Sequence, residues 1–163
     1  MGYSNFKKLK TVVKNFNLAT RSVGLFDKIQ IVPVNPTAWL LETLDMARLF
    51  PLTNEKNKSE RLVSPILLEV GKAYMDNISF FSGESIDIDS ALDLSGPCDF
   101  FFSLHPPQSF MEAPIISLAE AKNEDMEYGM AQCAAQLYGA RLFNEAEGKT
   151  VPFLYGCATD GVE

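Results

Sequence analysis

Apolar residues recur at helical spacing in four segments of the chain, and shorter apolar runs lie between and after them. The helical segments are residues 4–16, 36–50, 59–76 and 125–147. The short runs, which predict strands, are residues 28–34, 78–89, 99–102, 115–122 and 151–158. This arrangement of helical segments and short strands predicts an α/β protein.

Several residues predict where these elements begin, bend or end. Pro36 suits the first position of a helix, with Asn35 as its N-cap. Pro65 lies inside a helical segment, so that helix either begins at Pro65 or is kinked there. Gly83 predicts a bulge or turn within its strand. Residues 53–58 are interpreted as a charged linker.

The run from Ile115 to Lys122 is apolar for most of its length but ends in two opposite charges. Residues two apart in a strand point to the same face, so Glu120 and Lys122 project side by side. An apolar strand gains nothing in packing from such an end, whereas a metal-dependent hydrolytic site would use both groups. The simpler alternative is a solvent-facing ion pair, worth less than about 1 kcal/mol.

A second carboxylate, Asp99, precedes a run of phenylalanines that predicts a core strand. If that strand pairs with the strand of Glu120 through residues 104–114, the two carboxylates meet at neighbouring strand ends. Such carboxylates can hold a hard cation, for example Mg2+ at about 2.0–2.1 Å, and an ion-bound water can be the nucleophile. We therefore expect Mg2+, with Mn2+ as a substitute; otherwise Asp99 is a turn residue that binds a backbone amide.

Asp99 followed by Glu120-Ala121-Lys122 resembles the PD-(D/E)xK nuclease superfamily, and the chain is similar to the nuclease domain of type I restriction enzymes. The resemblance covers about the second half of the chain and implies a restriction-endonuclease-like fold, in which a mixed central β-sheet is flanked by α-helices. We expect a single domain, residues 1–163, with residues 1–58 as an N-terminal helical extension of a core at 59–163 that is short of one C-terminal strand. Cys98, between Pro97 and Asp99, departs from the motif.

The resemblance also implies roles for the site residues. Asp99 and Glu120 would bind the metal ion. Lys122 would orient the attacking water and offset negative charge in a phosphorane-like transition state.

Three further residues are candidates from the flanking helices. Glu69 lies at the edge of the apolar arc of its helix, where it would complete the metal site or be an ordinary border glutamate. Gln132 and Gln136 share a face of the helix that follows the lysine strand. We prefer Gln132 as the residue that reaches the site, because it is nearer the start of the helix; Gln136 is the alternative.

Length and composition indicate the number of domains and the cellular compartment. The length of 163 residues predicts one domain, and no apolar stretch has the length of a membrane span. Lysines without an apolar run at the N-terminus argue against a secretory signal. Three widely spaced cysteines suit a reducing compartment, so we expect a cytoplasmic protein. The single histidine, His105, excludes a zinc motif and most histidine-based catalysis.

The net charge of −7 opposes DNA as the partner, because nucleic-acid-binding domains usually carry a basic surface. Lysines are nevertheless concentrated near the N-terminus, at Lys7, Lys8, Lys10 and Lys14. The sequence predicts a divalent-metal-dependent, endonuclease-like phosphodiesterase that hydrolyses DNA. The alternatives are a catalytically inactive nuclease-fold module acting in binding or assembly, for example as a homodimer, and a glycosidase-like carboxylate pair, which would leave Lys122 without a role.

Overall fold

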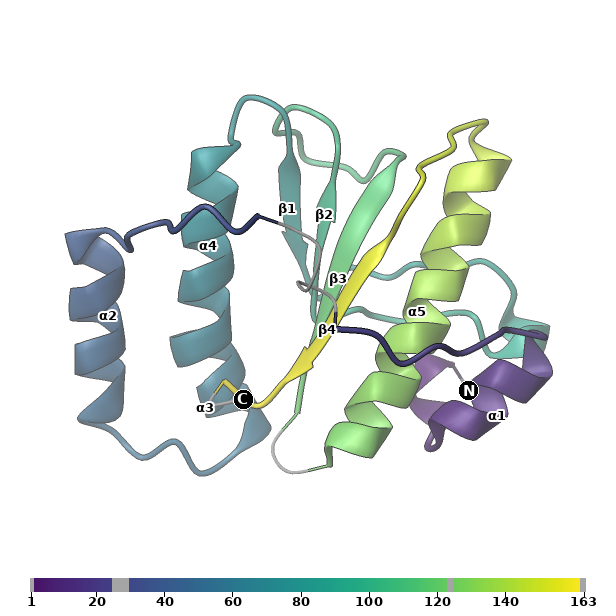
Figure 1. Cartoon of the computed structure of the whole chain (residues 1–163), viewed down its shortest axis with the longest axis horizontal. Helices are drawn as coiled ribbons and strands as arrows, with labels where there is room; N and C mark the ends of the chain where they lie inside the picture. Colours follow the sequence, from purple (N-terminus) through teal and green to yellow (C-terminus); the bar gives the residue numbers. More distant parts are fainter. Residues whose placement is uncertain (1, 25–29, 123–124, 162–163) are drawn as a thin grey trace.

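The computed structural model describes residues 2–24, 30–122 and 125–161. A four-stranded sheet lies between helices on both of its faces (Figure 1). The strands, in spatial order, are β1 (Ser79–Ser82), β2 (Phe100–Ser103), β3 (Ile115–Ala121) and β4 (Tyr155–Thr159). β1 pairs with β2 and β2 with β3 in antiparallel fashion, whereas β4 is parallel to β3. The predicted α/β class with a mixed sheet is confirmed.

The helices divide between the two faces. Helices α5 and α1 cover one face, while α4 covers the other with α2 outside it (Figure 1). The helical elements are η1 (Tyr3–Asn5), α1 (Leu9–Asn15), α2 (Ala38–Arg48), α3 (Glu55–Lys58), η2 (Ser59–Val63), α4 (Ser64–Ala73), η3 (Ser90–Leu92) and α5 (Met126–Ala146). Within the described part of the chain, no helix is long and apolar enough to cross a bilayer.

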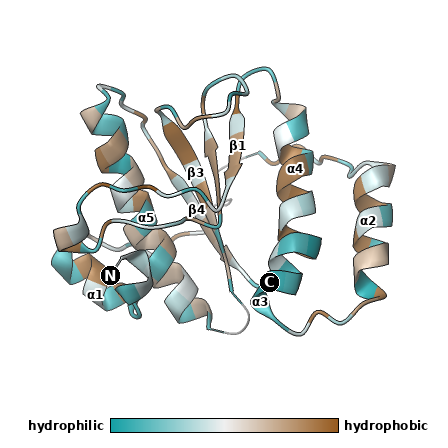
Figure 2. Ribbon diagram, turned by 180° about the vertical axis from the view of Figure 1, so that it is seen from behind, coloured by the Kyte–Doolittle hydropathy of each residue, from teal (hydrophilic) through white to brown (hydrophobic). Residues whose placement is uncertain are grey.

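The hairpin of β2 and β3 forms the centre of the sheet. Phe101 pairs with Leu118 and both belong to the buried cluster under α5, whereas Phe100 pairs with Ala119 in a second cluster under η2 and α4. This alternation gives the strands two buried faces. In Figure 2, much of β3 has the brown colour of hydrophobic residues. The predicted pairing of these strands through residues 104–114 is confirmed.

Helix α5 connects β3 to β4 and is fixed at both ends. Asp125 caps its start by accepting a hydrogen bond from the N–H of Tyr128 at 2.9 Å. Near its end, the buried Asn144 amide donates to the carbonyl of Ile115 and accepts from its N–H, both at 2.8 Å. Gly148 follows with φ +67°, as expected of a residue that ends a helix. The prediction of this helix is confirmed.

The N-terminal segment packs into the core, which differs from the predicted extension. Tyr3, Phe6 and Val12 belong to the same buried cluster as Phe101. The Tyr3 hydroxyl donates to the carbonyl of Ile86 at 2.9 Å. The part of the N-terminal segment that contains η1 and α1 is therefore built into the core, and the expected helix over residues 4–16 is reduced to these two elements.

The second and third helices differ from their predictions in how they start. Helix α2 is capped by Thr37, two residues after the expected Asn35. Residues 55–73 form one continuous helical stretch that includes residues 55–58 of the expected linker, and within it α4 begins at Ser64 with Pro65 in its first turn. The π-helical turn of η2 lies directly before Pro65, and its wider bonding accommodates a residue without an N–H.

Three predicted strands are shorter than expected or missing. β1 ends at Ser82 because Gly83 has φ +72°, so residues 85–89 contribute only isolated bridges. β4 begins at Tyr155 rather than at residue 151. In the strand expected at 28–34, residues 28 and 29 lie outside the described residues, and residues 30–34 are not in a strand.

Candidate active site

Two carboxylates meet where β2 begins and β3 ends. Because these strands are antiparallel, with Phe100 opposite Ala119, the residue before β2 lies at the same sheet edge as the end of β3. The Asp99 carboxylate accepts a hydrogen bond from the N–H of Ala121 at 2.8 Å. Its charge acts directly on Glu120. The structure therefore brings together the two carboxylates that the sequence predicts to converge.

Glu120 is almost completely buried, with an exposed fraction of 1%. Its Oε1 accepts from Nζ of Lys122 at 2.7 Å, and its Oε2 accepts from Nε2 of Gln136 at 2.9 Å. Both oxygens of the buried carboxylate are thus compensated by a donor, as a buried charge requires. This pair is not the solvent-facing ion pair of the simpler alternative.

Lys122 is surrounded by residues from two helices, α3 and α5. Its ammonium lies 3.6 Å from Oε1 of Glu55 in α3 and 5.2 Å from the centre of the Tyr128 ring in α5. Its exposed fraction is only 7%. Gly129 provides room for the stem of the side chain, because a Cβ there would lie 2.8 Å from Cγ of Lys122.

Burial and mutual repulsion change the proton affinities of the acids. Burial, reinforced by the charge of Asp99, raises the pKa of Glu120 to about 7, although Lys122 and Gln136 oppose the change. Burial also raises the pKa of Asp99, against the opposing effect of the Ala121 N–H. Burial lowers the pKa of Lys122, but Glu120, Glu55 and Asp99 outweigh that effect and the net pKa is raised. Lys122 is accordingly a cation beside two acids that ionise reluctantly.

An irregularity in the sheet positions Asp99. The N–H of Gly83 donates to the carbonyls of both Cys98 and Asp99, at 3.0 and 3.1 Å. Cys98 and Phe101 both face the cluster under α5, although residues three apart in a regular strand face opposite sides. The bulge or turn predicted at Gly83 is therefore present opposite Asp99, and it accommodates Cys98 between Pro97 and Asp99.

Glu69, predicted as a metal ligand, is engaged elsewhere. Its two carboxylate oxygens accept from the N–H and the hydroxyl of Thr37, at 2.7 and 3.0 Å, and so join α4 to the start of α2. The helical acid at the site is Glu55, which the sequence prediction missed. Asn54 caps the helix that begins with Glu55, and this N-cap signal could have placed the residue in a first helical turn.

The choice between the two glutamines is corrected as well. Gln136 donates a hydrogen bond to Glu120, whereas Gln132 makes no hydrogen bond to the carboxylates in the described structure. Gln132 is nevertheless 8% exposed, and its Oε1 has no hydrogen-bond partner in the described region; the same is true of Oε1 of Gln136. Gln132 and Gln136 were predicted to share a face of α5, but the sequence did not predict that Gln136 would be the one beside Glu120.

The site offers a divalent ion a small set of protein ligands. In the described ranges, no group of three or more His, Cys, Asp or Glu side chains is arranged to hold a metal. Asp99 and Glu120 provide two carboxylates whose repulsion a cation would relieve. Mg2+ binds through one or two carboxylates and keeps several waters, so this pair fits Mg2+ better than an ion that needs a full set of protein ligands.

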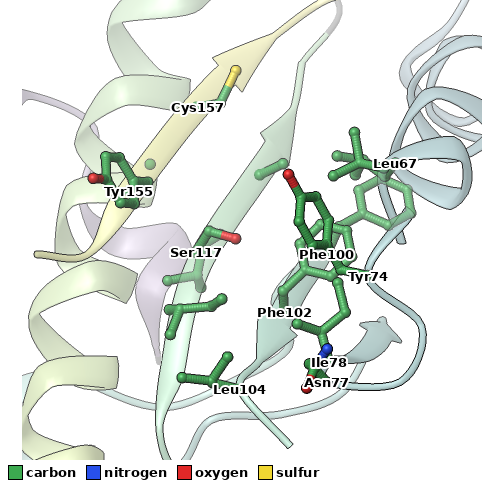
Figure 3. A pocket seen from close by; sticks show the side chains of 15 residues that line it. Leu67, Tyr74, Asn77, Ile78, Phe100, Phe102, Leu104, Ser117, Tyr155 and Cys157 are labelled. Atoms are coloured by element: carbon green, nitrogen blue, oxygen red, sulfur yellow. The ribbon is translucent and has the colours of Figure 1, made fainter. Parts of the chain in front are cut away.

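A separate apolar groove lies on the opposite face of the sheet, between α4 and strands β2 to β4 (Figure 3). Its volume is about 470 Å³, and its walls include Phe100, Phe102, Tyr74 and Tyr155. Tyr155, on the edge strand, is 58% exposed. The groove has no carboxylate or lysine among its lining residues, so it is distinct from the site of Asp99 and Glu120.

The fold and the site define a mixed α/β protein with a buried carboxylate–lysine cluster at the ends of its central strands. Comparisons of the chain with protein-family models, with curated proteins and with solved structures found no match.

Proposed function

We propose that this chain is a divalent-metal-dependent, nuclease-like protein of the restriction-endonuclease-like fold that hydrolyses DNA phosphodiester bonds. The observation that supports it is the meeting of Asp99, Glu120 and Lys122, with Nζ of Lys122 2.7 Å from the buried carboxylate. These are the three residues by which the sequence resembles the superfamily.

Each side chain of the site has a role under this proposal. Asp99 and Glu120 would hold Mg2+ or Mn2+, which supplies Lewis acidity and a water of lowered pKa when bound. Lys122 keeps its proton, because its net pKa is raised, and offers a positive charge to the developing phosphorane. Gln136 fixes the orientation of Glu120, and Glu55 holds the ammonium from the other side.

The test is cleavage of supercoiled plasmid and of single-stranded DNA with Mg2+, Mn2+ or EDTA. Lys122→Ala should lose roughly 10²–10³-fold in rate, as expected for removal of a charge that stabilises the transition state. Asp99→Asn, which can still accept from the Ala121 N–H, should lose metal-dependent cleavage while keeping the fold. Lys72→Ala, at an exposed position on α4, is the matched control.

Equal cleavage by the wild type and Lys122→Ala would reject the proposal. Because Lys122→Ala leaves Glu120 without its ammonium, near-UV circular dichroism should accompany the rates. A loss of rate in Asp99→Asn with an unchanged spectrum would separate chemistry from folding.

The second candidate function is a catalytically inactive nuclease-fold module that binds or assembles with another chain. It is favoured by the apolar groove beside the edge strand β4, whose Tyr155 is exposed. Sedimentation analysis of the wild type and Tyr155→Ser would test it. A stable homodimer that Tyr155→Ser dissociates, together with no cleavage in any metal, would favour this function over the nuclease.

A further inference from the structure

The charge of the chain is distributed unevenly. Residues 1–26 contain five of its fourteen basic residues and none of its twenty-one acidic residues. The five are Lys7, Lys8, Lys10, Lys14 and Arg21, and all are exposed. No ion pair involving these residues is present in the described part of the structure. A strongly acidic protein thus has one segment that is purely basic.

Within this segment, α1 and the residue that follows it are anchored to the rest of the protein. Val12 of α1 is completely buried, and the ring of Phe16 stacks on Tyr138 of α5 with 4.5 Å between centroids. Helix α1 therefore uses its apolar face for packing. Lys10 and Lys14, four residues apart, lie on a common helix face and are exposed.

The basic segment adjoins the candidate active site through Tyr128. The ammonium of Lys7 lies 3.9 Å from the centre of the Tyr128 ring, and that of Lys122 lies 5.2 Å from the same centre. The Tyr128 hydroxyl donates to the carbonyl of Ser4 at 3.1 Å, which ties η1 to α5. Figure 1 shows α1 beside the N-terminal half of α5, the end of the helix that is nearer to the end of β3.

We infer that the surface formed by Lys7, Lys8, Lys10 and Lys14 binds the phosphodiester backbone of a nucleic acid and directs it to the site of Lys122. Lysines that neutralise phosphates supply most of the sequence-independent affinity for nucleic acids. A local surface of this kind lets a chain of net charge −7 approach a polyanion. The choice of DNA over other nucleic acids rests on the proposed function.

Two features of the surroundings bear on the nature of the partner. Asp125 and Glu127, at the start of α5, are the exposed carboxylates in the described structure nearest in sequence to Tyr128, and the four lysines outnumber them.

A basic amphipathic helix can also bind an anionic membrane, but it does so by inserting its apolar face. In α1 the apolar face is buried against α5, so it is not available for insertion into a membrane. The exposed lysines therefore favour a nucleic acid over a membrane as the partner.

The experiment compares two triple variants that remove equal charge. Lys8, Lys10 and Lys14 are changed to Gln in one, and Arg48, Lys72 and Lys149, all exposed and outside the basic segment, are changed to Gln in the other. Binding of a labelled DNA duplex, its single strand and the corresponding RNA is measured by anisotropy in EDTA, where metal-dependent cleavage is blocked. Phosphatidylserine vesicles form the fourth arm.

The basic-surface variant should bind at least tenfold more weakly than the wild type on every nucleic acid that the wild type binds. Each lost phosphate contact should reduce the slope of log affinity against log salt by about 0.7–0.9, so the triple variant should lose roughly 2 to 3. The control variant should keep the wild-type slope. Single Lys8→Gln and Lys14→Gln variants, each expected to lose about 0.7–0.9 of slope, provide the measurement if the triple variant is unstable.

Equal slopes for the wild type and the basic-surface variant would overturn the inference, as would binding to vesicles alone or equal losses in both triple variants. The nucleic acid bound most tightly by the wild type identifies the source of the phosphates. If the wild type cleaves DNA but the basic-surface variant binds normally, this inference fails and the proposed function stands. If nothing is cleaved but the variant loses binding, the surface stands and the nuclease proposal fails.

Discussion

Ionisation of Glu120 should destabilise the folded protein as the pH rises. Burial and the neighbouring Asp99 raise the pKa of Glu120 from 4.5 to about 7 in the folded state, whereas the unfolded chain keeps an ordinary pKa. The folded state therefore holds the proton more tightly than the unfolded state. Between pH 4.5 and 7 the free energy of unfolding should fall, and above pH 7 this contribution should be constant.

The size of the effect follows from the change in pKa. Each unit of pKa corresponds to 1.36 kcal/mol, so a rise from 4.5 to about 7 costs the folded state about 3 kcal/mol when Glu120 is ionised. The raised pKa of Asp99 acts in the same direction. Because small proteins are stable by only about 5–15 kcal/mol, the change is large enough to measure by denaturant titration.

The assay is urea unfolding at several pH values from 4.5 to 8 for the wild type, Glu120→Gln and Glu145→Gln. Glu120→Gln cannot ionise and should have a flatter pH dependence. Glu145, an exposed partner of Arg141, serves as the control, and its variant should follow the wild type. A wild-type stability that rises over this range, or an identical slope in Glu120→Gln, would refute the reasoning.

A divalent ion provides the complementary measurement. If Mg2+ binds the ionised pair, its presence at ten times the dissociation constant should stabilise the protein by about 1.4 kcal/mol at pH 7.5. At pH 5, where Glu120 holds its proton, the gain should be much smaller. A gain that is equal at both pH values, or that persists in Glu120→Gln, would show that the ion binds elsewhere.

Three other substitutions follow from single contacts. Glu69→Ala removes both hydrogen bonds to Thr37. It should lower the free energy of unfolding in urea by about 1–2 kcal/mol without lowering the rate of DNA cleavage. A loss of cleavage at unchanged stability would indicate that Glu69 belongs to the active site. Gly129→Ala places a Cβ 2.8 Å from Lys122 and should cost about 1–3 kcal/mol, whereas Gly71→Ala, with only an ordinary 3.5 Å contact, should be neutral or stabilising. Glu55→Gln should slow cleavage while leaving the unfolding free energy nearly unchanged, and a normal rate would exclude Glu55 from the site.

The parts of the fold that the sequence predicts are those decided by local pattern. The phenylalanine run and the apolar strand that ends at Glu120 are joined by a short connection, so an antiparallel hairpin is their simplest pairing. An antiparallel pair places the start of one strand beside the end of the other. That geometry alone is enough to bring Asp99 to the Glu120–Lys122 edge, which is why three residues of the site could be predicted.

The helical acid could not be predicted because it depends on length along a helix. Glu55 and Glu69 belong to one continuous helical stretch, and at 1.5 Å per residue they are roughly 20 Å apart. Only one of them can be level with the sheet edge. The π-helical turn between them also alters the 100° periodicity on which the apolar arc was drawn. Hydrophobic periodicity predicts which face of a helix is buried. Which of its turns lies level with the sheet edge is decided by tertiary packing.

Because periodicity does not give the height at which a helix packs, it also could not decide between Gln132 and Gln136. Glu120 has buried partners from two elements, Lys122 in the extension of its own strand and Gln136 in α5. Replacing a buried ion pair with apolar residues is often neutral or stabilising, so a fold selected for stability alone has no need of this cluster. If the unfolding experiments show that ionisation of Glu120 destabilises the fold, the buried charges are better explained by binding or chemistry than by stability, and the difference between the wild type and Glu120→Gln measures the cost.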